Sequence, residues 1–215
     1  PDRAGTARLS HPFRSAWSVF RDDAGFRGVC VTAMLFMSAV LLFPHYQALA
    51  RERLDSANLD LMIWVIVQNA GTGIFGLASG WLADRCGNRL VVRLLIFAAA
   101  LVPLTALVLT HLDTLRLYGL VFFGLGLTPV VMRTLSNYSL EFAAPAEHPR
   151  YLSTLRLAMA VPFLLSPLVG WLVDAIGFAP VFLAVAAAIA AAGLLTFRLH
   201  EPRHAGGSRV VTGEW

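Results

Sequence analysis

Six long apolar stretches constrain the fold of this chain more than any other feature. None of them contains Asp, Glu, Lys or Arg, and they cover residues 28–49, 61–83, 94–112, 117–132, 157–173 and 178–197. A helix needs about 20 mostly apolar residues to cross a bilayer. Strands of a membrane barrel would alternate apolar and polar residues, and these stretches do not. The sequence therefore predicts an all-α polytopic membrane protein with six transmembrane helices, the fourth of which continues past Arg133.

The composition agrees with a membrane protein. Hydrophobic residues make up 57% of the chain and charged residues 14%, whereas soluble domains carry about 25% charged residues. All 17 basic residues are arginines that lie between the apolar stretches, so we expect no nucleic-acid partner. Cys30 and Cys86 are too few for a disulfide framework or a zinc site, and no metal, cofactor or enzymatic chemistry is expected.

The arginines also predict the orientation. Fourteen of them fall in the N-terminal segment, the second gap, the fourth gap with its flanks, and the tail; Arg51, Arg53 and Arg116 fall on the other side. Positive loops stay in the cytoplasm, so both termini should be cytoplasmic in a multi-pass protein of the plasma (inner) membrane.

Three regions are expected along the chain. Residues 1–26 form a basic linker or N-terminal segment, in which Phe13, Trp17 and Phe20 have the spacing of an amphipathic helix as an alternative. Residues 27–198 form the helical bundle, and residues 199–215 form a disordered cytoplasmic tail. The chain begins at Pro1 without an initiator Met, which indicates a processed or truncated N-terminus.

An internal repeat relates two segments 90 residues apart. Segments 80–91 and 170–181 are identical at six of twelve positions, namely Gly, Trp, Leu, Asp, a second Gly and Val. They end the second and fifth predicted spans, which puts them on opposite sides of the membrane. Arg85 and Arg89 of the first copy become Ala175 and Ala179 in the second. This pattern is typical of an inverted 3+3 repeat.

The first copy carries a loop motif, Gly80-x-x-x-Asp84-Arg85-x-Gly87-Asn88-Arg89. Gly80, with Gly76 one turn earlier, lets helices approach closely, and Gly87 permits a tight turn. The motif resembles the loop signature of the major facilitator superfamily, although Asn88 replaces a residue that is commonly basic. The resemblance implies that Asp84, Arg85 and Arg89 latch cytoplasmic helix ends together in one state of transport, with Glu141 as the acidic partner.

The resemblance covers residues 28–198 and implies half of a transporter that moves a small-molecule substrate by alternating access. We expect the C-terminal six-helix half, whose partners are the lipid bilayer and either a missing N-terminal half or a second copy of the chain. A non-transporting membrane factor on the same fold, for assembly or partner binding, is the alternative, because fold does not determine function.

Polar residues within the spans are candidates for a substrate pathway, because they are costly there. These are Gln68, Asn69, Arg133, Asn137 and Tyr138. Gln68 and Asn69 could equally form helix–helix hydrogen bonds, and Arg133 could snorkel or pair with Glu141. No acidic residue lies at mid-membrane depth, so no proton-coupling site is expected in this chain.

One further motif matches a cofactor-binding pattern. Residues 71–76 match the dinucleotide pattern G-x-G-x-x-G, but they follow no strand and lie within an apolar stretch. The pattern therefore favours helix packing.

Overall fold

The computed structural model describes residues 17–54 and 58–199, and their regular structure is helical throughout. Six segments are long and apolar enough to cross a membrane, which confirms the predicted all-α fold: Ala24–Leu54, Asp60–Cys86, Asn88–His111, Leu115–Leu140, Pro145–Ile176 and Phe178–Arg198. The main helices are α2 (Ala24–Leu41), α3 (Phe43–Leu54), α4 (Asn58–Cys86), α5 (Asn88–His111), α6 (Gly119–Leu125), α7 (Leu127–Leu140), α8 (His148–Ala160), α9 (Ser166–Ile176) and α10 (Phe178–Leu195). Short 3₁₀ helices complete them: η1 (Leu115–Leu117), η2 (Pro145–Glu147), η3 (Val161–Leu165) and η4 (Thr196–Arg198).

Three of the spans are broken rather than continuous helices. The first is interrupted between α2 and α3, just before Pro44, and the fourth is interrupted at Gly126 between α6 and α7. The fifth passes through η3, which contains Pro162, and Pro167 is the second residue of the next helix. Proline removes a backbone donor and disrupts the preceding turn. The fourth span reaches Leu140, so its predicted continuation past Arg133 is confirmed.

A short helix over residues 17–22 precedes the first span. The rings of Trp17 and Phe20 stack with centroids 5.8 Å apart, and the Arg150 guanidinium donates a 2.6 Å hydrogen bond to the Ser18 hydroxyl. Phe13 and the predicted tail from residue 200 onward lie outside the described residues. The described part of the N-terminal segment is therefore attached to the start of the fifth span.

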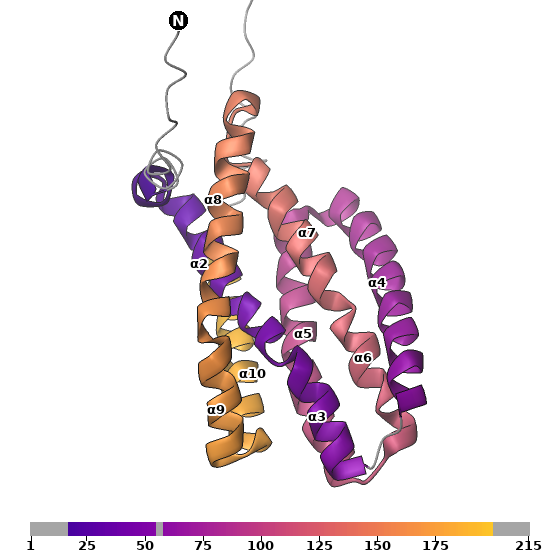
Figure 1. Cartoon of the computed structure of the whole chain (residues 1–215). Coiled ribbons are helices and arrows are strands. Elements are labelled where there is room, and N and C mark those ends of the chain that lie inside the picture. Colours follow the sequence, from indigo (N-terminus) through magenta and orange to yellow (C-terminus); the bar gives the residue numbers. More distant parts are fainter. Residues whose placement is uncertain (1–16, 55–57, 200–215) are drawn as a thin grey trace, which may run out of the picture.

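Two spans lie at opposite edges of the bundle, with α4 on one side and α8–α9 on the other (Figure 1). These two spans are also the least buried. In their apolar stretches, 11% of the residues of the α4 span and 22% of those of the α8–α9 span are buried inside the structure, against 39–56% for the other four spans. Each is the second span of its trio. Large apolar side chains are exposed on both, among them Ile66, Leu77 and Trp81 on α4 and Leu164 and Trp171 on the fifth span.

Aromatic residues hold the interior together near one end. The Tyr118 hydroxyl donates a 2.9 Å hydrogen bond to the carbonyl oxygen of Tyr46, and the Tyr46 ring meets Phe182 edge-on with centroids 5.0 Å apart. Trp64 stacks on Phe122 at 4.9 Å. Because a buried hydroxyl needs a partner, the Tyr118 bond ties the fourth span to the first.

Glycine allows a close crossing between α4 and the α6–α7 junction. A Cβ atom on Gly126 would lie 2.6 Å from the Thr72 nitrogen and 2.7 Å from the Gln68 carbonyl oxygen. Gly71, the first glycine of the G-x-G-x-x-G run, lies at this crossing, so this part of the run serves helix packing. Gly76 and Gly80 behave differently, because a Cβ atom on either would have no described neighbour within 4 Å. The close approach expected at these two glycines therefore does not occur within the described chain.

Candidate functional site

The two copies of the internal repeat form the same turn at opposite ends of the bundle. Gly87 has φ 83° and ψ 155°, and Gly177 has φ 83° and ψ 174°. The Gly87 amide donates to the Ala83 carbonyl at 3.0 Å, and the Gly177 amide donates to the Val173 carbonyl at 2.9 Å. Gly87 joins α4 to α5 at one end, and Gly177 joins α9 to α10 at the other (Figure 1). Only glycine adopts this backbone region without strain, which explains the second glycine of each copy.

The loop after α4 is connected to two other helix ends. The Asn88 side-chain amide donates a 2.7 Å hydrogen bond to Glu141 Oε1 at the end of α7. The Arg89 guanidinium donates to the Phe197 carbonyl oxygen at 3.0 Å, at the end of the sixth span. The contact with Glu141 therefore includes Asn88, the residue at which the motif departs from the common pattern.

Asp84 and Arg85 are exposed at the same end of the bundle. The Arg85 guanidinium lies over the Trp81 ring, 3.9 Å from its centroid, as a cation–π contact. Asp84 makes no hydrogen bond or ion pair with any other residue that the structure describes. The motif thus divides into an anchored part, Asn88 and Arg89, and an exposed part.

Sequence reasoning missed Arg93, which lies one turn after Arg89 on α5. Its Nε donates to Thr196 Oγ1 at 3.1 Å and its Nη2 donates to the Thr196 carbonyl at 3.3 Å. The guanidinium also covers the Phe197 ring at 3.9 Å. The i, i+4 spacing from Arg89 was the available signal, since such residues share a helix face.

The predicted pathway residues do not form one cluster. Asn69 is exposed on α4 and donates a 2.8 Å hydrogen bond to Val65 of its own helix. Gln68 is half-buried beside the glycine crossing. On α7, Arg133 and Asn137 are exposed, whereas Tyr138 is fully buried with its ring edge-on to Phe142 at 5.2 Å.

Arg133 lines a pocket of about 530 Å³ between α2, α7 and α8. Arg156, which was not predicted as a site residue, lines the same pocket from α8. The other lining residues are Met37, Met132, Ser136, Met159, Ala160 and Phe163. We call this the two-arginine pocket.

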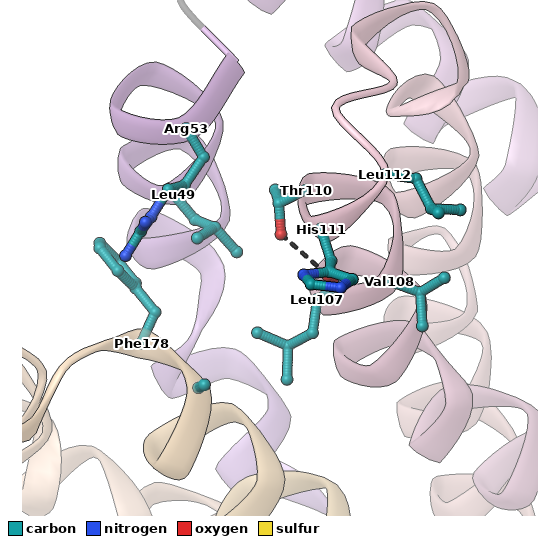
Figure 2. A pocket seen from close by; sticks show the side chains of 9 residues that line it. Leu49, Arg53, Leu107, Val108, Thr110, His111, Leu112 and Phe178 are labelled. Carbon is teal, nitrogen blue, oxygen red and sulfur yellow. Dashed lines mark hydrogen bonds between the residues drawn. The ribbon is translucent and has the colours of Figure 1, made fainter.

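A second pocket of about 590 Å³ lies at the Gly177 end of the bundle. Side chains of α3, α5 and the start of α10 surround it, including Leu49, Arg53, Leu107 and Phe178 (Figure 2). The Thr110 hydroxyl donates to the Leu107 carbonyl at 3.0 Å and so is bonded within its own helix. This pocket shares no lining residue with the two-arginine pocket.

The family model described as Major Facilitator Superfamily matches residues 51–213. The chain belongs to the Major Facilitator Superfamily. The match includes five of the six spans in full, and no curated protein matches the chain. Members of this superfamily are membrane transporters rather than enzymes, so the six spans are those of a multi-pass transporter half-domain. The match does not favour the alternative of a non-transporting factor.

Proposed function

We propose that this Major Facilitator Superfamily chain carries a small solute across the bilayer by alternating access. The paired turns at Gly87 and Gly177 support the proposal most directly. They share one backbone conformation and lie at opposite ends of the bundle, which is the arrangement expected of two helix trios with inverted orientation. Inverted repeats allow a transporter to rock around a fixed central site.

The edges of the bundle support a partner of similar size. α4 and α8–α9 expose large apolar side chains along their length, and Gly76 and Gly80 leave open space on α4. A second six-helix unit, either an N-terminal half or another copy of this chain, would cover these surfaces. Rocking would then occur between the two units.

The arginines support an orientation with both termini in the cytoplasm. The Gly87 end of the bundle carries Arg85, Arg89, Arg93, Arg150 and Arg198, and the Gly177 end carries Arg51, Arg53 and Arg116. Under the positive-inside rule the Gly87 end faces the cytoplasm, and the plasma (inner) membrane is the proposed location.

The loop after α4 would act as a conformational latch. Asn88 and Arg89 hold it on the ends of α7 and of the sixth span, and we propose that the loop moves together with these helices. Asp84 and Arg85 are exposed, and we propose that they engage the partner unit in one state only. A contact made in one state biases the equilibrium between states.

The solute pathway would follow the polar groups that remain exposed. Arg133 and Asn137 lie one turn apart on the exposed face of α7, and Asn69 is exposed on α4. Gln68 and Tyr138 are more enclosed, and we propose that they shape the wall of the pathway.

The latch can be tested by uptake into proteoliposomes that contain the protein expressed from its complete reading frame. A panel of labelled sugars, amino acids, organic cations and organic anions would serve as substrates. Asp84→Asn should lower uptake about tenfold or more, since a charged hydrogen bond contributes roughly 1.5–3 kcal/mol. The substitution should not change membrane insertion, which is measured as the amount of extracted protein that elutes as a single peak in size-exclusion chromatography.

Asp174→Asn is the matched control, because Asp174 is the equivalent residue of the second copy and is also exposed. It lies in a turn without arginines and should retain uptake. Normal uptake by Asp84→Asn would remove the latch role, and failure of every solute to accumulate in vesicles of the unsubstituted protein would contradict transport.

A further inference from the structure

The lining of the two-arginine pocket carries two positive charges and no negative charge. Arg133 lies seven residues before the end of α7, and Arg156 lies eight residues after the start of α8. At 1.5 Å per residue, both lie roughly 10–12 Å from these helix ends. Neither arginine makes a hydrogen bond or ion pair with a residue in the described part of the chain. No carboxylate lines the pocket with them.

The fifth span contributes four residues to the pocket. Arg156, Met159 and Ala160 follow the i, i+3, i+4 spacing that places residues on one side of α8, and Phe163 follows them on η3. Met132, Arg133 and Ser136 face them from α7, and the buried side chain of Met37 lies behind them on α2. These helices lie next to each other in the bundle (Figure 1).

The arginines are the hydrogen-bond donors that the pocket can offer to a ligand. The Ser136 hydroxyl already donates to the Met132 carbonyl at 2.8 Å. The remaining lining is thioether, methyl and aromatic, which accommodates apolar groups of varied shape. A sugar would find too few polar partners here, and a cation would meet two like charges.

We propose that this pocket binds a water-soluble organic anion with an apolar, aryl-sized body. The anionic group lies between Arg133 and Arg156, and the apolar body contacts Met37, Met159 and Phe163. The proposal rests on the transport function above, since it names the class of solute carried. Arg133 and Arg156 bind the anion as charge-assisted donors, and its charge offsets the repulsion between the two guanidinium groups.

Calorimetric binding of 2-naphthoate and its neutral isostere 2-naphthamide tests this assignment. The protein, expressed from its complete reading frame, is held in nanodiscs of phosphatidylcholine. We expect 2-naphthoate to bind about tenfold or more tightly than 2-naphthamide, with an affinity that falls as the salt concentration rises. Comparable binding of the two probes, or no binding of 2-naphthoate up to about 1 mM, would overturn the assignment.

Substitution identifies the residues. Arg133→Gln and Arg156→Gln should each weaken 2-naphthoate binding about tenfold, and Arg133→Lys should retain part of it because the charge remains. The matched control is Arg116→Gln, an exposed arginine at the other end of the same span, and its affinity should not change. An equal loss in Arg116→Gln would show a general effect of net charge and would overturn the role of the pocket. If a Gln variant does not fold, the naphthoate–naphthamide comparison still decides.

Two further results separate this site from its rivals. Displacement of 2-naphthoate by phosphatidylglycerol added to the nanodisc would assign the pocket to a lipid headgroup and overturn a soluble ligand. Uptake of another solute class without 2-naphthoate binding would reject the anion site and leave the transport function standing. Binding of 2-naphthoate without uptake of any solute would reject the transport function and leave the anion site standing.

Discussion

At the scale of single residues, the loop after α4 owes its geometry to Gly87 and its attachment to Asn88. The sequence predicted a turn at the glycine and an acidic partner at Glu141, and Asn88 bonds to that carboxylate at 2.7 Å. The choice of Asn88 as the donor could not be predicted, because several polar side chains of the loop could reach the same helix end. Local backbone demands are visible in a sequence, whereas the choice among nearby donors depends on packing.

Alanine at either repeated glycine should destabilise the protein. Gly87→Ala and Gly177→Ala would each place a Cβ atom at φ 83°, which costs about 1–3 kcal/mol. Unfolding in mixed micelles with rising dodecyl sulfate, followed by tryptophan fluorescence, measures the change in free energy.

Gly119→Ala is the matched control for these two variants. Its Cβ atom would lie 3.7 Å from the Trp64 ring, an ordinary contact, and Gly119 is not among the residues with positive φ. Its free energy of unfolding should stay within about 0.5 kcal/mol of the parent. A Gly177→Ala protein as stable as Gly119→Ala would contradict the strained turn.

At the scale of elements, the spans are longer and more irregular than their apolar stretches. The third span begins at Asn88 rather than near Leu94, because the helix extends beyond the hydrophobic stretch into the anchored loop. Arg93 falls in this extension and connects α5 to η4 through two hydrogen bonds to Thr196. Hydropathy marks the part of a helix that lipid surrounds, and helix ends depend on contacts with neighbouring segments.

Removal of Arg93 should loosen the end of the sixth span. Arg93→Gln cannot keep both hydrogen bonds to Thr196 or the stacking on Phe197, so we expect a loss of about 1–3 kcal/mol in local stability. Hydrogen exchange of the amides of residues 194–198 should become faster by about tenfold or more.

Arg198→Gln is the corresponding control on η4 itself. Arg198 is exposed and makes no hydrogen bond or ion pair within the described residues, so exchange should remain at the parent rate. Unchanged exchange in Arg93→Gln would mean that apolar packing alone holds this end.

At the scale of the whole molecule, two spans carry the exposed surfaces. α4 and α8–α9 occupy equivalent positions in the two trios and lie at opposite edges of the bundle (Figure 1). This arrangement follows from the inverted repeat, since equivalent helices of two inverted trios occur in equivalent surroundings. It leaves α2, α7 and α8 next to each other, where the two-arginine pocket forms.

Site-directed labelling tests the inverted topology. Cys86 is exposed at the Gly87 end, and Cys30 is fully buried, so a membrane-impermeant maleimide should label Cys86 in inverted vesicles and not in intact cells. Ala179→Cys in a Cys86→Ala background places an exposed thiol at the Gly177 end. This thiol should be labelled in intact cells, and labelling of both positions from one side would contradict the architecture.

Patterns in the sequence were enough to predict the number of spans, their all-α character, the inverted relation of the two trios and the two glycine turns. These properties follow from hydropathy and backbone conformation, which act over a few consecutive residues. The folded structure was needed to find that Asn88 bonds to Glu141, that Arg93 bonds to Thr196, and that Arg133 and Arg156 line one pocket. Such contacts join distant parts of the chain, and they depend on how each helix is rotated and bent against its neighbours, which no local pattern specifies.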